Sequence, residues 1–241
     1  MRKYALGMGA LLLAFMLGPP KPLRAGTIGL TLNNPGNNVM GGVYVGGYNF
    51  TVGSQQMQLV CDDFQHDVYA GESWTANTST FSQSSFLSNV LFTGTNEKAN
   101  YEEVGWLVQQ MFSPANSGNA VTVGDIQWAI WDVFYPVQCS NGKIGISNCD
   151  PWGNLSAYQS GINYWLSQAQ MPSNYSTGNY SNLVIYTPVP GTPGPPQEYF
   201  GMQAMPESMT LWSLLVALAA IALAYKWVDK ATVEPTASGR V

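Results

Sequence analysis

The sequence GDIQWAIWDVF, residues 124–134, predicts a helix and is the stretch around which we expect the fold to form. Thr122 can cap its N-terminus, and Pro136 is expected to end it. Helical spacing places Gln127 on an apolar face, together with Val123, Ile130, Trp131 and Phe134. A carboxamide on such a face must find hydrogen-bond partners. Gln127 is therefore either a core residue bonded to the backbone or part of a site.

A second stretch, QLVCDDF at residues 58–64, predicts an apolar strand that ends in Cys61. If a thiol and a carboxamide meet in a dry pocket, they can condense. The sulfur attacks the carboxamide carbon, ammonia leaves, and an internal thioester remains. Cys61 and Gln127 are thus our candidate site residues. The alternative is that Cys61 is a buried free thiol that packs as a small hydrophobic residue.

The three cysteines favour one disulfide. Cys139 and Cys149 flank a short loop, and in an exported chain they are expected to pair. We expect their Cα atoms to lie within about 7 Å of each other. Cys61 is then the unpaired cysteine.

The N-terminal segment has the features of a signal peptide. Arg2 and Lys3 precede an apolar run at residues 5–17, and residues 23–25 (LRA) form an acceptable cleavage site. We therefore expect residues 1–25 to be a signal peptide, which predicts export, and residues 26–204 to form one domain.

The C-terminal segment, residues 205–230, predicts a membrane anchor. Pro206 and Glu207 precede an apolar run at residues 209–225, which is followed by Lys226 and Lys230. The run is close to the minimum of roughly 17–25 residues for a membrane helix. Positive charges after the helix predict that its C-terminal side faces the cytoplasm. Residues 231–241 would be a short polar tail.

The composition narrows the class of protein. Charged residues make up only 10% of the chain, and the formal net charge is −5. The chain has no basic stripe, so nucleic acid is not an expected partner. A polar, uncharged and aromatic composition suits an extracellular β-rich protein better than a cytoplasmic enzyme.

Residue patterns predict strands before and after a group of helices, which indicates an α+β fold: a β barrel or sandwich with a helical insert. Gly46-Gly47 is a hairpin candidate between two of the strands. The expected helices, besides residues 124–134, are 97–112 and a segment marked by residues 155–166 and closed by Pro172. The expected strands are residues 27–32, 43–45, 48–52, 56–60, 68–75, 182–186 and 198–202.

Polar residues near Cys61 suggest two further kinds of site. A cation site could use Asp62, Asp63, His66 and Asp67, but there is no second histidine and no EF-hand spacing. We interpret these residues as a solvated acidic loop or as turn and cap residues, and expect neither a metal nor a cofactor. In a cysteine hydrolase, Cys61 would be the nucleophile and His66 the base, but their spacing on a loop is unfavourable.

The C-terminal segment resembles the sorting signal of PEP-CTERM proteins, in which a Pro-Glu motif is followed by a membrane helix and basic residues. Pro206 and Glu207 match the motif, although Ser208 stands where the family has proline. The basic residues are sparse, only Lys226 and Lys230, and the chain continues eleven residues beyond Lys230. The resemblance implies an envelope protein of the Gram-negative type.

The domain resembles the thioester domains of bacterial surface adhesins. In that family a cysteine after an apolar strand is cross-linked to a glutamine in the pattern apolar-Gln-x-Ala-apolar-Trp. Residues 126–131 (IQWAIW) fit this pattern, and residues 59–61 (LVC) fit the cysteine side. The family is best known from Gram-positive surfaces, and Asp62-Asp63 is more acidic than its pattern. The resemblance implies covalent adhesion through Cys61 and Gln127.

Together these features predict an exported, membrane-anchored surface protein that is not a turnover enzyme. Its partners would be the membrane, through the C-terminal helix, and an amine- or hydroxyl-bearing surface ligand or an envelope polysaccharide. Two alternatives remain open: an inert structural envelope protein in which Cys61 and Gln127 merely pack, and the cysteine hydrolase.

Overall fold

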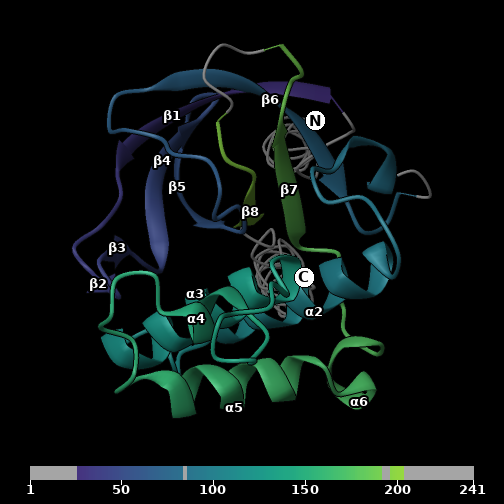
Figure 1. The fold of residues 1–241 in the computed structure, drawn as a ribbon. Coiled ribbons are helices and arrows are strands. Elements are labelled where there is room, and N and C mark those ends of the chain that lie inside the picture. Colours follow the sequence, from purple (N-terminus) through teal and green to yellow (C-terminus); the bar gives the residue numbers. More distant parts are fainter. Residues whose placement is uncertain (1–25, 84–85, 192–195, 204–241) are drawn as a thin grey trace, which may run out of the picture. The chain divides into compact units, whose positions relative to one another are not determined.

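Alternating side chains build the interior of a β barrel. In the strand Gly47–Val52, the side chains of Tyr48, Phe50 and Val52 are buried, and the residues between them are more exposed. The computed structural model describes residues 26–83, 86–191 and 196–203 (Figure 1). Six antiparallel strands close into a barrel in the order β1-β4-β5-β8-β7-β6. The α+β class and the barrel are therefore confirmed.

The strands and helices have the following bounds. The strands are β1 Gly26–Asn34, β2 Val39–Met40, β3 Val43–Tyr44, β4 Gly47–Val52, β5 Gln55–Cys61, β6 Ser73–Thr80, β7 Leu183–Pro188 and β8 Tyr199–Met202. The helices are α2 Glu97–Phe112, α3 Ala120–Phe134, α4 Ile146–Cys149, α5 Gln159–Ala169 and α6 Pro172–Tyr175, with a 3₁₀ turn, η1, at Phe86–Asn89. All the helices of the described residues lie between β6 and β7 in the chain, as a helical insert.

Helix α3 is the central element of the insert. Figure 1 shows the helices gathered at one end of the barrel, with α5 on the far side of α3. Ten consecutive residues of α3, from Gly124 to Val133, are buried, so the helix is enclosed on every side. At Gly124 a Cβ atom would lie 2.4 Å from Met40 Cε, so any larger residue would require the Met40 side chain to move. The indole Nε1 of Trp128 donates to the Met40 carbonyl at 3.3 Å.

Two local expectations about the strands are wrong. The Gly46-Gly47 hairpin does not form, because β3 pairs with β2, whereas β4 pairs with β1 and β5. Gly46 has a φ of 98° and separates the small β2–β3 sheet from the barrel. The expected strand at residues 68–75 also starts later, since β6 begins at Ser73 and a turn precedes it.

The helix boundaries differ from expectation at three points. The N-cap of α3 is Asn119, whose side chain accepts from the backbone N–H groups of Val121 and Thr122, so Thr122 lies within the first turn. Helix α5 begins at Gln159. Pro172 is the first residue of α6, a position at which its missing N–H is not needed.

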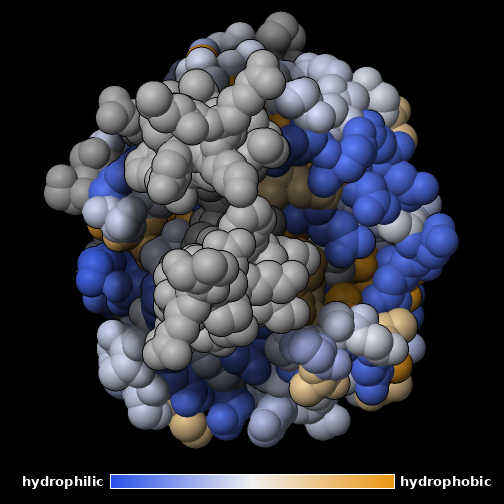
Figure 2. All heavy atoms as spheres, turned by 180° about the vertical axis from the view of Figure 1, so that it is seen from behind, coloured by the Kyte–Doolittle hydropathy of each residue, from blue (hydrophilic) through white to orange (hydrophobic). Residues whose placement is uncertain are grey.

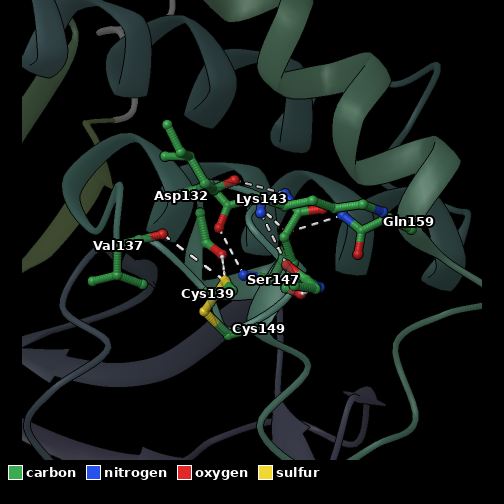
Figure 3. Close-up of a disulfide and its surroundings, with 11 residues drawn as sticks. Asp132, Val137, Cys139, Lys143, Ser147, Cys149 and Gln159 are labelled. Carbon is green, nitrogen blue, oxygen red and sulfur yellow. Dashed lines mark hydrogen bonds between the residues drawn. A yellow bond between two sulfur atoms is a disulfide. The ribbon is translucent and has the colours of Figure 1, made fainter.

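The predicted disulfide between Cys139 and Cys149 is present, with a Cα–Cα distance of 5.0 Å (Figure 3). Closing so short a loop stabilises the fold by about 2–3 kcal/mol. The loop is also joined to α3, because Asp132 accepts from the Ser147 N–H at 2.8 Å and from the Ser147 hydroxyl at 2.5 Å. Burial raises the pKa of Asp132 to about 6, although the bonds from Ser147 work in the other direction.

Both ends of the chain lie outside the described residues. The signal peptide at 1–25, the Pro206-Glu207 motif and the C-terminal membrane helix therefore stay predictions. Within the described residues, none of the helices has the length and apolar character needed to span a membrane. The surface visible in Figure 2 is mostly hydrophilic, with scattered apolar areas.

Asp125 is an unexpected buried charge on α3. Its side chain is 8% exposed and packs against α5, where a Cβ at Gly161 would lie 2.1 Å from its Oδ2. Its Oδ1 has no hydrogen-bond partner among the described residues. Burial raises the pKa of Asp125 from 3.8 to about 6. The folded state therefore binds this proton more tightly than the unfolded chain does. As the pH rises from about 4 through 6, the carboxyl group must ionise in its buried position, and the free energy of unfolding falls.

We predict that Asp125→Asn flattens this pH dependence. The unfolding free energy of the variant minus that of the wild type should rise by about 1–3 kcal/mol between pH 4 and pH 7, measured by urea denaturation. Asn163→Ala, which removes an exposed side chain on α5 that does not titrate, serves as the control, and its difference from wild type should stay constant. A constant difference for Asp125→Asn as well would show that its carboxyl group titrates alike in the folded and unfolded chains.

Candidate functional site

Cys61 is the last residue of β5 and is fully buried. It pairs with Tyr199 of β8, and its side chain belongs to the hydrophobic cluster inside the barrel. Tyr48 and Tyr199 of that cluster contact each other edge to face, with ring centroids 5.9 Å apart. The thiol is thus held at the helical end of the barrel, away from water.

Gln127 of α3 meets Cys61 across 66 residues of chain. The carboxamide Nε2 donates to the Cys61 carbonyl oxygen at 2.6 Å, and the carboxamide Oε1 accepts from the Gly46 N–H at 3.3 Å. The side chain is fully buried. The structure therefore brings the two candidate residues into direct contact, while the thioester between them stays a prediction.

Gly46 supplies the N–H that faces the Gln127 carbonyl group. Its φ of 98° lies in the region that favours glycine, and a Cβ there would lie 2.7 Å from Val123 Cγ1 of α3. Any larger residue would push the segment before β4 away from the helix. The N–H also points at the oxygen on which negative charge develops when a nucleophile attacks the carboxamide carbon.

The Cys61 thiol is protonated at neutral pH. Burial raises its pKa well above the ordinary value, and the negative charge of Asp63 raises it further. The thiol donates to the Asp63 carbonyl oxygen at 3.1 Å, which favours the protonated form, whereas the Trp131 side chain acts against the rise. Condensation with Gln127 would form the S–C bond and break the C–N bond, and the thiol proton would leave with the ammonia.

Asp62 and Glu198 form a buried pair of carboxyl groups next to Cys61. Glu198 accepts from the Tyr101 hydroxyl at 2.5 Å, from the Leu91 N–H at 2.9 Å and from the Thr187 hydroxyl. No other donor in the described chain reaches the Asp62 oxygens. Burial and the charge of Glu198 raise the pKa of Asp62, and burial also raises the pKa of Glu198. We therefore assign one shared proton to the pair, carried by Asp62.

The prediction that Asp62 and Asp63 lie in a solvated loop is wrong, because both residues are fully buried.

Asp63 joins the loop after β5 to α3. Its carboxylate accepts from the Tyr135 hydroxyl at 2.7 Å, from the Gln65 N–H at 3.0 Å and from His66 Nδ1 at 2.5 Å. The expectation of a turn residue is thus confirmed for Asp63. Among the described residues, the Cys61 thiol bonds to the Asp63 carbonyl and not to His66. No group of three metal-ligating side chains occurs there either.

Several residues of the site were missed in the sequence. Glu198, Tyr101, Gly46 and Trp131 were not singled out as site residues. Glu198 and Tyr101 lie 97 residues apart, and no local pattern links them to Cys61. For Trp131 a signal was present, because it follows Gln127 by one helical turn and shares its face.

Comparisons with known proteins give little to add. The sequence matches no protein-family model and no curated protein. Among solved structures, the fold is similar to the N-terminal domain of the Streptococcus pyogenes pilus tip adhesin Cpa, with a TM-score of 0.43 and 12% sequence identity. The similarity covers 77% of this chain and 97% of that chain. A TM-score of this size assigns neither a family nor a function.

We predict that Gly46→Ala impairs condensation of Cys61 with Gln127. The added methyl group would displace the Gly46 N–H from the Gln127 oxygen, so fewer freshly made chains should weigh one ammonia less than their sequence, as measured by intact-protein mass spectrometry. Gly118→Ala is the matched control, because a Cβ there meets no atom within 4 Å. An unchanged fraction in Gly46→Ala would remove the assigned role of its N–H.

Proposed function

We propose that this chain is an exported, anchored surface protein whose Cys61 and Gln127 form an internal thioester. The observation that carries the proposal is the hydrogen bond from the Gln127 carboxamide to the carbonyl of Cys61 itself. This bond holds the carboxamide against the backbone of the cysteine whose thiol would attack it, and well-oriented groups of one molecule reach effective molarities of roughly 10⁵–10⁸ M. Burial of both side chains excludes the water that would hydrolyse the product.

The thioester would capture a target by a single acyl transfer. An amine or hydroxyl group of the target attacks the carbonyl carbon of residue 127, the C–S bond breaks, and the proton of the nucleophile goes to the Cys61 sulfur. The Gly46 N–H would stabilise the oxyanion in this step as well. The new amide or ester does not regenerate the C–S bond, so each chain reacts once. The protein is in this sense an adhesin and not an enzyme.

Export and anchoring belong to the same proposal. A disulfide is typical of chains that fold in an oxidising compartment, which supports passage out of the cytoplasm. The predicted signal peptide and the PEP-CTERM-like segment with Pro206 and Glu207 would direct the chain to the envelope and hold it there.

Two other functions use the same residues. In an inert envelope protein, Gln127 would be a core residue, and its bonds to Gly46 and Cys61 already satisfy its carboxamide. In a cysteine hydrolase, His66 would have to deprotonate Cys61, and the Asp63 carboxylate does orient His66. The raised pKa of the buried thiol, caused first by desolvation, disfavours this second alternative.

The mass of the intact protein tests the thioester. Freshly purified wild type in amine-free buffer should weigh one ammonia less than its sequence, and methylamine should add to it. Cys61→Ala and Gln127→Ala should have their full expected masses and should not react. Gln109→Ala, which changes a glutamine on α2 that bonds to the Asn179 carbonyl, should behave like wild type. Full mass in the wild type would leave the inert protein as the better interpretation.

Deletion of residues 205–241 tests the anchor. Without the apolar run, the domain should move from the membrane fraction to the periplasm or medium, which fractionation and immunoblotting would detect. Deletion of residues 231–241 alone should leave the protein with the membrane. If the larger deletion also stays in the membrane fraction, the C-terminal segment is not the anchor.

A further inference from the structure

A pocket of about 600 Å³ opens beside the Cys61–Gln127 site. Its walls come from β3, β4, the loop after β5, helix α3 and the loop after α4. Six aromatic residues line it: Tyr44, Tyr48, Phe64, Tyr69, Trp131 and Trp152. So many rings around one cavity indicate a binding site, because they give a ligand a large, rigid contact surface.

Two of these rings also neighbour the Cys61 thiol. Trp131 follows Gln127 by one helical turn on α3, and its side chain interacts with the Cys61 thiol. Tyr48 packs in the same hydrophobic cluster as Cys61 inside the barrel. Both residues also line the pocket. The pocket and the Cys61–Gln127 pair therefore share Tyr48 and Trp131 as neighbours.

The outer rings are exposed to an unusual degree. The side chains of Tyr44, Tyr69 and Trp152 are 48%, 67% and 51% exposed. Trp152 contacts Phe64 with ring centroids 5.9 Å apart, and Phe64 contacts Trp131 at 5.0 Å. The rings thus continue from the surface to the inner wall of the pocket. Such large apolar faces gain stability when a ligand covers them.

The polar groups of the pocket decide what kind of ligand fits. The side chains of Gln65 and Asp67 line the pocket and form no hydrogen bond within the described chain, so both are free to bind hydroxyl groups. No lysine or arginine lines the pocket, and the only ones between residues 26 and 203 are Lys98 and Lys143. A ligand carrying phosphate, sulfate or carboxylate would find no cation and would be repelled by Asp67.

The size of the pocket distinguishes between the two remaining kinds of ligand, an ammonium group and a sugar ring. An ammonium group could bind to the aromatic rings and to Asp67. A cation–π site is small, however, because it needs only the rings that lie within about 6 Å of the charge. A volume of about 600 Å³ is larger than such a cage requires and matches small-molecule sites, which span roughly 300–1,000 Å³. A sugar ring has C–H-rich faces that pack on aromatic rings and hydroxyl groups around its edge.

We propose that this pocket binds a neutral sugar ring of a polysaccharide and presents one of its hydroxyl groups to the thioester. This rests on the proposed function for the covalent step only. The sugar oxygen would form an ester with the carbonyl carbon of residue 127, the C–S bond would break, and the hydroxyl proton would go to the Cys61 sulfur. The aromatic pocket would thus choose the target that the thioester captures.

Binding without chemistry tests the pocket. Full-length Cys61→Ala, which cannot form the thioester, should bind members of an array of neutral oligosaccharides, and should bind acidic oligosaccharides and Nα-acetyl-lysine weakly or not at all. Tyr69→Ala and Trp152→Ala, added to this variant, should each weaken binding about tenfold. Tyr164→Ala is the control, because Tyr164 is an equally exposed aromatic on α5 that does not line the pocket. No binding to neutral sugars, a preference for the lysine probe, or unchanged binding in both pocket variants would overturn the proposal.

The wild-type chain tests the covalent step separately. Incubated with a sugar that Cys61→Ala binds, it should gain the mass of that sugar and release a free Cys61 thiol. Ammonia loss and sugar binding without this adduct would overturn the role of the hydroxyl group. Sugar binding without ammonia loss would overturn the proposed thioester but leave the pocket, whereas ammonia loss without sugar binding would do the reverse.

Discussion

The hydrogen bond from Gln127 to the Cys61 carbonyl holds the two halves of the domain in register. It joins the part of α3 that is buried on every face to the end of a barrel strand, at a point where no water can replace it. An unpaired buried carboxamide costs about 1–3 kcal/mol, so any shift of α3 along the barrel is unfavourable. The close approach of Gly124 to Met40 on one side and of Gly46 to Val123 on the other both serve this contact.

Local patterns predicted the parts of the fold that depend on neighbouring residues. The helix at residues 97–112 has the bounds expected from its apolar spacing, and α3 and β5 were placed with small errors at their ends. The Gly46-Gly47 hairpin failed because a two-residue glycine turn is a local signal, whereas the pairing of β4 with β1 is decided by closure of the barrel. The contact of Cys61 with Gln127 was expected only through a family pattern. The pairing of Asp62 with Glu198 had no signal, since acidic residues next to a turn usually face solvent.

Burial gives the site two properties that suit the proposed acyl transfer, in which each chain reacts only once. It keeps the Cys61 thiol protonated, because the raised pKa leaves no thiolate at neutral pH, so the cysteine resists oxidation and exchange. It also keeps the Gln127 carboxamide, whose carbon is the proposed reaction centre, away from bulk water. A reactive bond in this position would be long-lived until a ligand enters from the pocket side.

Cys61 and Gln127 lie 66 positions apart in the chain, so folding alone brings them together. Gln127 lies on α3, within the helical insert between β6 and β7, and its contact with Cys61 at the end of β5 exists only in the folded domain. A chain that crosses a membrane unfolded would carry an ordinary thiol and an ordinary amide. Its reactivity would arise later, at its destination, and would mark those molecules that had folded correctly.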